Sequence, residues 1–362
     1  MKILLLIPFY TGSHKAWANG FKEYSSHEVE IFHLPGRHWK WRMHGAAITF
    51  ARMLTDSDFK PDRIFATDML DVALFRATAK IDVPIYTYFH ENQLTYPWSP
   101  TDEDTSKGRD KHYGFINYTT ALASDKVFFN SHFHKDSFLA AAKKFLRSMP
   151  DHQNLNTLDQ IESKSSVLYL GMDLARFDPF KKAKVRNKIP VILWNHRWEY
   201  DKNPEEFFDL LFKLKERSFD FKLIVLGQAY GKTPPIFEKA KQTLADRIIH
   251  YGYADSFDQY ASLLCKSDIL PVTNIQDFFG GSIVEAIYCG CYPLLPNRLT
   301  YPELIPEAHH KKHIYKDDLE LRLKKLLIEW NSINYVNTLA EHVNSFDWSR
   351  IISKYELQFL NT

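Results

Sequence analysis

A glycine pair between two acidic residues is the most chemically suggestive segment of the sequence. Gly280 and Gly281 follow a predicted strand and open a predicted helix. Backbone N–H groups at such a turn, together with the helix dipole, favour an anion such as a diphosphate. Asp277 and Glu285 flank the turn, and their carboxylates could accept hydrogen bonds from sugar or ribose hydroxyls. A glycine pair alone more often only makes a turn, so the two acids are what favour a binding site.

Two cations follow the predicted strand Val191–Trp194. Arg197 and Lys202 could converge on a diphosphate and neutralise the charge that builds on it as a sugar departs. Such a pair would replace a metal ion, and we expect none. Isolated cations in a loop are more often solvated, but ligands of parallel sheets bind at the carboxyl ends of the strands. That location favours the functional interpretation.

The first half of the chain has a similar polar cluster, at the end of the predicted strand Val83–Phe89. His90 could hydrogen-bond a transferred sugar, and Glu91 could orient His90 or contact an acceptor. A lone histidine at a strand end is more often structural. The turn around Gly12, after the first strand, could bring backbone N–H groups near the same sugar.

A segment rich in basic and aromatic residues, Gly36–His44, suggests contact with RNA. It interleaves three Lys or Arg residues with two Trp and two His. Aromatic faces can stack unpaired bases at ~1–3 kcal/mol per base, and cations can follow phosphates. Alternatively, Trp39 and Trp41 pack on their own domain while the cations stay solvated. Composition leaves these two interpretations even.

Strand-like and helix-like stretches that alternate along the whole chain must position these residues. At 362 residues the chain exceeds the roughly 250–300 residues that one core usually serves. We therefore predict an α/β fold with two doubly wound, Rossmann-like domains, whose strand ends face each other across a cleft. The domains are predicted at 1–185 and 186–345, with a C-terminal helix at 346–362 that crosses back to the first domain.

The individual elements follow from periodicity. The predicted strands are Lys2–Pro8, Glu28–His33, Arg63–Thr67, Val83–Phe89, Lys126–Asn130, Ser166–Leu170, Val191–Trp194, Phe221–Leu226, Ile248–Tyr251, Asp268–Pro271 and Tyr292–Leu295. The predicted helices include Ala46–Leu54, Tyr113–Ala123, Phe133–Leu146, Pro204–Lys215, Pro235–Leu244, Ser256–Leu264 and Trp348–Phe359.

Composition excludes several classes of protein. The net charge of +2, from 46 basic and 44 acidic residues, is too small to coat nucleic acid or an anionic membrane. The first apolar run, Ile3–Ile7, is too short for a signal peptide or a membrane span. The three cysteines, Cys265, Cys289 and Cys291, fit reduced thiols rather than a zinc site. We expect a cytoplasmic protein with no membrane contact and no obligate protein partner.

Four segments of the sequence, taken together, resemble the retaining GT-B glycosyltransferases of family four. The resemblance rests on the acid pair Asp277 and Glu285, on Arg197 with Lys202, on His90, and on the block Gly171–Phe177. One departure is Asp277, where the general pattern has Glu. Its side chain is one methylene shorter, which affects contact with the sugar hydroxyls.

A closer resemblance is to the tRNA-queuosine mannosyltransferase family, also called the glycosyltransferase-like domain-containing protein 1 family. The similar blocks span most of the chain and are Phe9–Lys15, Leu34–Pro35 with Trp39–Arg42, Phe89–Leu94 with Tyr96–Pro97, Pro150–His152, and Phe278–Gly280 with Tyr288–Pro293. This resemblance implies transfer of mannose from GDP-mannose, with retention, to queuosine in the anticodon loop of a tRNA.

Together, the residues and the resemblance give three sets of expected site residues. The catalytic set is His90, Arg197, Lys202 and Asp277. The donor-binding set is Gly12, Arg197, Lys202, Tyr253, Phe279, Gly280, Gly281, Ser282 and Glu285, with Tyr253 as a wall for the base. The acceptor-binding set is Ser13, His14, Arg37, Trp39, Lys40, Trp41, Arg42, Glu91 and Asn92. The alternatives are a glycosyltransferase with a lipid or glycan acceptor, and a catalytically silent GT-B adaptor that binds RNA.

Overall fold

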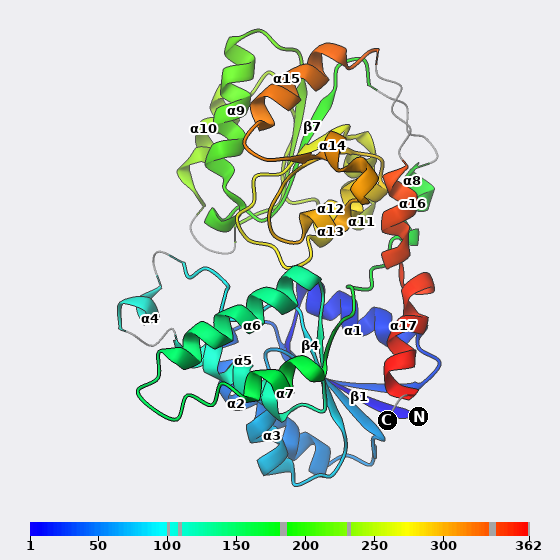
Figure 1. The fold of residues 1–362 in the computed structure, drawn as a ribbon. Helices are drawn as coiled ribbons and strands as arrows, with labels where there is room; N and C mark the ends of the chain where they lie inside the picture. The colour runs from blue at the N-terminus through cyan, green and yellow to red at the C-terminus, as the bar shows by residue number, and fades with distance from the viewer. Residues whose placement is uncertain (100–101, 108–110, 182–186, 230–232, 333–337, 361–362) are drawn as a thin grey trace. The chain divides into compact units, whose positions relative to one another are not determined.

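The structure, a computed structural model, describes residues 1–99, 102–107, 111–181, 187–229, 233–332 and 338–360. The chain forms two compact units (Figure 1). Unit 1 comprises Met1–Met172 and Trp348–Thr362, and unit 2 comprises Asp173–Asp347. Each unit contains a six-stranded parallel sheet with helices on its faces. The predicted α/β class is confirmed.

The boundary expected near residue 185 lies outside the described residues. The division by packing falls earlier, because η1 (Ala175–Phe177) and α8 (Asp178–Lys181) pack within unit 2. The ring of Phe177 lies 5.0 Å from that of Phe257, and the ring of Phe180 lies 6.1 Å from the same ring.

The sheet of unit 1 has the strand order β2-β1-β3-β4-β5-β6. Its strands are β1 (Lys2–Tyr10), β2 (Glu28–Pro35), β3 (Arg63–Thr67), β4 (Ile85–Phe89), β5 (Lys126–Phe129) and β6 (Ser165–Val167). Ile3 to Ile7 are fully buried, because helices cover both faces of a parallel sheet and its central strands must be apolar throughout.

Alternate strand residues of unit 1 face two helical layers. Leu4 and Ile64 pack with α2, whereas Phe65 packs with α1 and the C-terminal helix α17. The helices of this unit are α1 (Gly12–Tyr24), α2 (Trp39–Thr55), α3 (Val72–Ala79), α4 (Glu103–Ser106), α5 (Lys111–Ala123), α6 (His132–Arg147), α7 (Thr157–Ser163) and α17 (Trp348–Leu360).

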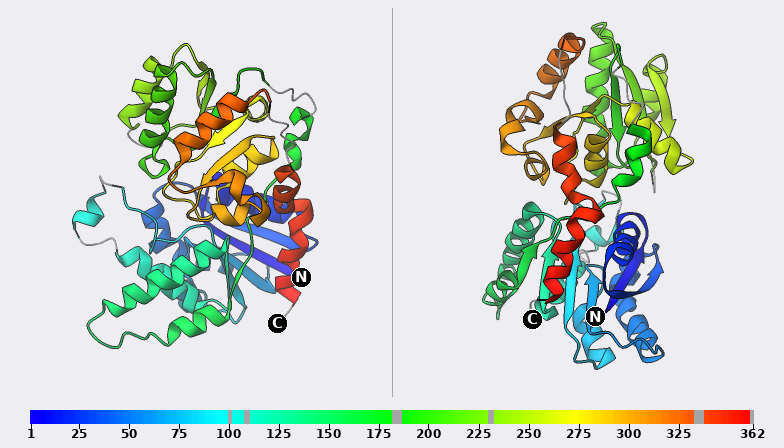
Figure 2. Two further views of the ribbon diagram at one scale, coloured as in Figure 1. Left: turned by 45° about the horizontal axis from the view of Figure 1, so that its top comes forward. Right: turned by 90° about the vertical axis from the view of Figure 1, so that its right-hand side faces the viewer.

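The helix α17 lies beside α1 on unit 1 (Figures 1 and 2). Trp348 at its start packs against Gly20 and Gly171, where an added Cβ would come within 1.9 Å and 2.6 Å of the indole. Only glycine fits at these two positions. Tyr355 in the middle of α17 accepts a hydrogen bond from Nε1 of Trp17 at 3.1 Å. Residues that are far apart in the sequence thus pack together in the core of unit 1.

The sheet of unit 2 has the strand order β12-β11-β10-β7-β8-β9. Its strands are β7 (Val191–Asn195), β8 (Lys222–Leu226), β9 (Ile248–Gly252), β10 (Ile269–Pro271), β11 (Tyr292–Pro296) and β12 (Ile314–Tyr315). Its remaining helices are η2 (Tyr200–Lys202), α9 (Pro204–Glu216), α10 (Pro235–Thr243), α11 (Phe257–Lys266), α12 (Gly281–Tyr288), α13 (Tyr301–Leu304), η3 (Glu307–His309), α14 (His310–His313), α15 (Leu319–Glu329), α16 (Leu339–Val343) and η4 (Asn344–Phe346).

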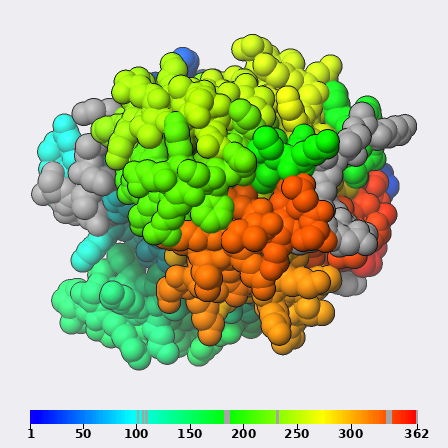
Figure 3. Space-filling model, turned by 90° about the horizontal axis from the view of Figure 1, so that it is seen from above, coloured from blue at the N-terminus to red at the C-terminus, as the bar shows by residue number. Residues whose placement is uncertain are grey.

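Aromatic and leucine side chains of α9, α10 and α15 form the main core of unit 2 against β7, β8 and β10. The outer surfaces of these helices are seen in Figure 3. The helix α12 contacts β7 and α11. None of the helices in the described part of the chain is both long and apolar enough to cross a membrane.

Several elements differ from the prediction by one or two residues at an end, and two differ by more. The helix α2 begins at Trp39 rather than at Ala46, because Trp39 to Arg42 continue the helix with polar and aromatic side chains that obscure its apolar periodicity. The predicted strand Ser166–Leu170 is shorter, as β6 ends at Val167.

Candidate active site

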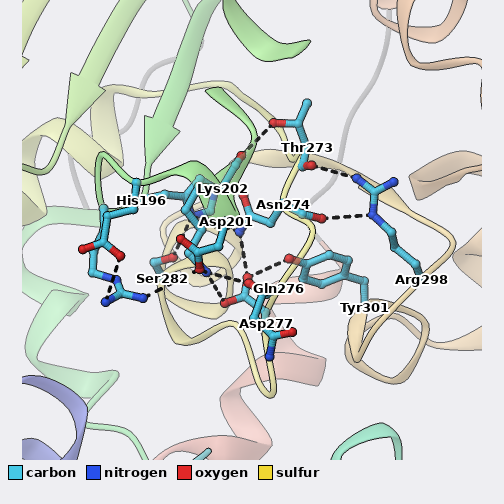
Figure 4. Close-up of polar contacts among 12 residues, drawn as sticks. His196, Asp201, Lys202, Thr273, Asn274, Gln276, Asp277, Ser282, Arg298 and Tyr301 are labelled. Atoms are coloured by element: carbon cyan, nitrogen blue, oxygen red, sulfur yellow. Dashed lines mark hydrogen bonds and ion pairs between the residues drawn. The ribbon is translucent and has the colours of Figure 1, made fainter. Parts of the chain in front are cut away.

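Polar residues gather where β7 and β10 end, and we call this region the unit 2 edge. The two strands are neighbours and parallel, so the segments that follow them, residues 196–203 and 272–280, lie together (Figure 4). Thr273 Oγ1 donates hydrogen bonds to the carbonyls of Lys202 and Asn203 at 3.2 Å and 3.0 Å. Arg298 donates to the carbonyls of Thr273 and Asn274, which fixes the second segment.

Lys202 is the central cation of the unit 2 edge and is only 6% exposed. Its Nζ lies 3.0 Å from Asp277 Oδ1 and 3.1 Å from Asp201 Oδ2, and it donates to the carbonyl of Gln276 at 2.6 Å. Burial alone would lower the pKa of Lys202, but the carboxylates of Asp277 and Asp201 outweigh burial and raise it. Lys202 is therefore a fixed positive charge.

Asp277 receives hydrogen bonds at both carboxylate oxygens. Besides Lys202, it accepts from Asn274 Nδ2 at 2.7 Å and from the Tyr301 hydroxyl at 2.6 Å, both at Oδ2. Burial would raise the pKa of Asp277, but the Lys202 ammonium and these hydrogen bonds lower it overall. The side chain is thus an ionised and rigidly held acceptor.

Arg197 lies beside this cluster and is more exposed than Lys202. Its guanidinium lies 3.3 Å from Glu199 and 3.8 Å from Asp201 Oδ2. Asp201 therefore contacts both predicted cations, and Arg197 and Lys202 lie together as expected. About half of the Arg197 side chain remains exposed, so its guanidinium can turn toward a ligand.

The N-terminus of α12 lies next to the end of β7. Gly280 caps the helix with a φ of 85°, a conformation that strongly favours glycine. Asn195 donates to the carbonyl of Ser282 at 3.1 Å and to the Tyr260 hydroxyl at 3.0 Å, which joins strand and helix. Phe279 is buried, with its ring 5.2 Å from that of Phe346.

Glu285 lies one turn into α12 and is held by two groups. The Tyr260 hydroxyl donates to Glu285 Oε2 at 2.6 Å, and Arg176 contacts Oε1 at 3.3 Å. Burial raises the pKa of Glu285, and the contacts with Tyr260 and Arg176 only partly offset this effect.

Tyr253 lies away from this cluster in the strand order. It follows β9, which is two strands from β7, and its side chain is 64% exposed. The structure therefore places it along the same edge of the sheet but not among the residues around Lys202.

In unit 1, histidines and a buried acid gather where β1, β3 and β4 end, and we call this region the unit 1 edge. The imidazole of His90 lies 4.2 Å from that of His14, centroid to centroid. Burial, and then the neighbouring His14 and His134, lower the pKa of His90 well below 6.5, and burial lowers the pKa of His14 to about 4. Both imidazoles are neutral at neutral pH.

Asp68 follows β3 and fixes the backbone of His90. Its Oδ1 accepts the His90 N–H at 2.8 Å, and Asn130 donates to the His90 carbonyl at 2.9 Å. Burial, and then the nearby Glu91 carboxylate, raise the pKa of Asp68 well above its usual value. Sequence reasoning missed Asp68, although an acid directly after a buried strand could have indicated it.

The other expected residues of this edge have mixed environments. Asn92 is buried, and its Oδ1 accepts hydrogen bonds from the backbone of Leu94 and Thr95, so it shapes its own turn. Glu91 accepts a hydrogen bond from the side chain of Gln93 at 3.1 Å. Gly12 and Ser13 are exposed at the start of α1.

The segment around α2 divides into packed and exposed residues. The indole of Trp39 packs near Trp98 and Tyr113. Lys40 is paired with Asp102 at 2.7 Å and also with Asp104, so most of its charge is neutralised. Arg37 is exposed, and Arg42 donates through Nε to the carbonyl of Pro35 at 3.2 Å.

Trp41 differs from Trp39, since it is 64% exposed. Its ring lies over Gly45, where an added Cβ would come within 2.8 Å of the indole. The glycine thus lets the ring lie flat against the helix and remain accessible.

Several residues of the unit 2 edge went unassigned in the sequence analysis. Asn195, His196 and Asp201 lie within the segment that carried Arg197 and Lys202, so the strand end was their signal. Tyr260 and Tyr301 come from helices elsewhere in the chain, and local patterns contain no signal for them. Arg176 lies in the block Gly171–Phe177 that supported the family resemblance, but it was given no role. No group of three or more His, Cys, Asp or Glu side chains in the described ranges is arranged to hold a metal ion.

Comparison with known proteins matches both halves of the chain to family models. Residues 176–340 match the model for glycosyl transferases group 1, and residues 2–172 match the model for the tRNA-queuosine alpha-mannosyltransferase N-terminal region. Similar solved structures include HepE of Anabaena in complex with UDP, with a TM-score of 0.67 and 15% identity, and the sucrose-phosphate synthase of Thermosynechococcus elongatus, with a TM-score of 0.72 and 12% identity. Both alignments cover 100% of each chain.

Fold and family models together define a glycosyltransferase of the GT-B fold. A tRNA-queuosine alpha-mannosyltransferase of Drosophila melanogaster is 37% identical over 324 residues, which cover 85% of this chain and 82% of the relative. The chain therefore belongs to the tRNA-queuosine alpha-mannosyltransferase family, as its sequence blocks suggested.

Proposed function

We propose that the chain transfers mannose from GDP-mannose to queuosine in the anticodon loop of a tRNA, with retention and without a metal ion. The observation that carries this proposal is the 37% identity to the Drosophila relative over most of both chains. The location that fits a tRNA acceptor is the cytoplasm, and we propose it on that ground.

In the proposed reaction the bond between mannose C1 and the β-phosphate oxygen breaks, and its electron pair stays on the departing GDP. A queuosine hydroxyl oxygen forms the new bond to C1 on the same face, and its proton passes to the departing phosphate. Negative charge grows on the diphosphate, so fixed positive groups must stabilise it. Arg197, Lys202 and the N-terminus of α12 supply such groups at the unit 2 edge.

The acids of the unit 2 edge would position the donor. Asp277 already accepts from three donors, and a carboxylate has about four lone-pair sites. One site therefore remains for a sugar hydroxyl, in a direction that the other three bonds restrict. Glu285, held by Tyr260 and Arg176, would accept from the ribose in the same way. His90 would contact the sugar as a neutral hydrogen-bonding group.

For the acceptor, the exposed indole of Trp41 offers a stacking surface for an unpaired base. Arg37 and Arg42 lie in the same segment and would contact phosphates. Lys40 contributes less than its charge suggests, because Asp102 and Asp104 neutralise it. Trp39 acts by packing rather than by stacking on RNA.

The direct test is incorporation of radiolabelled mannose from GDP-mannose into purified tRNA that contains or lacks queuosine. We expect label only in tRNA with queuosine, and only with the wild-type protein; Arg197→Ala, whose side chain is half exposed, is the matched inactive control. Label in both tRNA samples would point to a different acceptor. Absence of label with GDP-mannose and with other nucleotide sugars would refute the proposed activity.

A further inference from the structure

His196 lies directly after β7 and has no role in the function proposed so far. It is 6% exposed, and its backbone is fixed from two sides. Trp194 Nε1 donates to the His196 carbonyl at 3.1 Å. Gly227, with a φ of 114°, lies so close that an added Cβ would come within 2.2 Å of the same oxygen. The imidazole therefore leaves the strand end in a defined direction.

The neighbours of His196 determine which ring nitrogen carries the proton. Asn274 Nδ2 donates to the Asp277 carboxylate at 2.7 Å, so the atom that faces His196 Nδ1 at 3.5 Å is an N–H donor. The Ser282 hydroxyl lies 3.3 Å from the same Nδ1. The Asn274 N–H can only donate, and the Ser282 hydroxyl can also donate, so Nδ1 is the accepting nitrogen and the proton lies on Nε2.

The Nε2–H group is buried and has no hydrogen-bond partner among the described residues. A buried donor without an acceptor destabilises a protein, and such groups are uncommon. Loss of the proton cannot remove this donor, since neutral imidazole keeps one N–H. Gain of a second proton is also opposed, because burial lowers the pKa of His196 to about 3, even though Asp277 favours the charged form.

The ring lies against Ser282 in the first turn of α12, the helix terminus that suits an anion. We propose that the Nε2–H of neutral His196 donates a hydrogen bond to a diphosphate oxygen of the nucleotide-sugar donor. This inference rests on the proposed function, because it deepens the description of the donor site. Anionic oxygen is the strongest acceptor for such a donor, and the contact persists across neutral pH.

Two substitutions separate the atoms of the ring. His196→Gln places an amide near the position of Nε2, whereas His196→Asn retains a polar atom only near the position of Nδ1. The affinity of each full-length variant is measured by calorimetry with GDP or UDP, whichever the wild-type protein binds more tightly, and by competition with the matching nucleoside. The control is His313→Asn in unit 2, a second buried histidine, whose Nδ1 pairs with the Pro293 carbonyl.

We expect His196→Asn to weaken nucleoside diphosphate binding about tenfold and to leave nucleoside binding unchanged. His196→Gln should recover most of the lost diphosphate affinity. His313→Asn should lower the unfolding temperature without this pattern. If wild type and His196→Asn bind the diphosphate with equal affinity, the inference is overturned. It is also overturned if His196→Asn weakens binding of the diphosphate and of the nucleoside equally, because that result indicates a structural role for His196. Failure of the wild-type protein to bind any nucleoside diphosphate would instead refute the proposed function.

Discussion

The two sheets end in edges of opposite electrostatic character. At the unit 2 edge, Lys202 lies between the carboxylates of Asp277 and Asp201, and its charge is kept by ion pairs. At the unit 1 edge, the rings of His14 and His90 lie 4.2 Å apart, and burial keeps both uncharged. One edge thus holds a buried cation between two acids, and the other holds a pair of neutral imidazoles.

The difference matches two kinds of ligand chemistry. A group whose charge increases during a reaction needs fixed charges that do not have to reorganise. Hydroxyl groups of a sugar need hydrogen-bond donors and acceptors, which neutral imidazoles supply. On the proposed function, the fixed charges of the unit 2 edge suit the diphosphate, and the neutral imidazoles of the unit 1 edge suit sugar hydroxyls.

The largest expected effect comes from removal of either cation. Arg197→Ala and Lys202→Met should each lower kcat/KM for mannose transfer by a factor of roughly 10²–10³ or more. Lys202→Met should also reduce the free energy of unfolding by about 3–5 kcal/mol, because it removes the cation paired with Asp277 and the nearer of the two cations beside the buried Asp201. Arg197→Ala should cost about 1 kcal/mol or less, because that side chain is half exposed.

Steady-state kinetics and urea unfolding measure these two effects separately. Near-normal rates for both variants would mean that other groups stabilise the diphosphate. Equal stability of Lys202→Met and wild type would contradict the view that Lys202 neutralises the two acids.

At the unit 1 edge, His90→Ala should lower kcat about ten- to a hundredfold, the cost of a sugar group left without its hydrogen bond. The affinity for GDP should not change, since the proposed contact of His90 is with the sugar. Calorimetry with GDP and single-turnover rates distinguish the two quantities. A parallel fall in GDP affinity would contradict the assignment of His90 to the sugar alone, and with it the proposed difference between the two edges.

A second pair of variants compares the two tryptophans of α2. Trp41→Ala should weaken tRNA binding about tenfold, within the range expected for loss of one stacked base, and leave the KM for GDP-mannose unchanged. Trp39→Ala should mainly lower stability, because this indole packs with Trp98 and Tyr113. Filter binding and thermal unfolding measure both. Unchanged tRNA affinity in Trp41→Ala would remove this indole from the acceptor surface.

The last expected effect concerns the pH dependence of stability rather than binding or rate. The pKa of His14 is about 4 in the folded protein and about 6.5 when unfolded, so the unfolded state takes up the proton first. The stability associated with neutral His14 is present above pH 6.5 and is lost as the pH falls toward 4. Between about pH 7.5 and about pH 5 this amounts to about 2 kcal/mol.

His14→Gln should therefore lose less stability than the wild-type protein over that range, as urea unfolding at the two pH values would reveal. The unit 2 edge provides the contrast. The pKa of Asp277 is lowered, so its contribution is retained throughout this range and is lost only in stronger acid. An identical pH dependence for His14→Gln and wild type would mean that His14 is not held neutral by burial.

Sequence patterns were sufficient for the parallel sheets and for the location of the main motifs. Apolar runs such as Ile3–Ile7 must be buried strands, and polar residues directly after such strands, such as His90 and Arg197, must lie at the carboxyl edge. The exposure of the residues in Gly36–His44 could not be predicted in the same way. Asp102 and Asp104, which neutralise Lys40, lie about 60 residues farther along the chain.

The sequence by itself therefore determined the fold class, the family and the segments that carry chemistry, because these depend on periodicity and on short blocks of neighbouring residues. Only the tertiary structure decided the electrostatic state of each group. It brought Asp277 to Lys202 and Tyr260 to Glu285, and it buried His14 and His90 together. Charge and pKa depend on partners and burial within a few ångströms, and those distances are set by how strands and helices pack, not by their order in the chain.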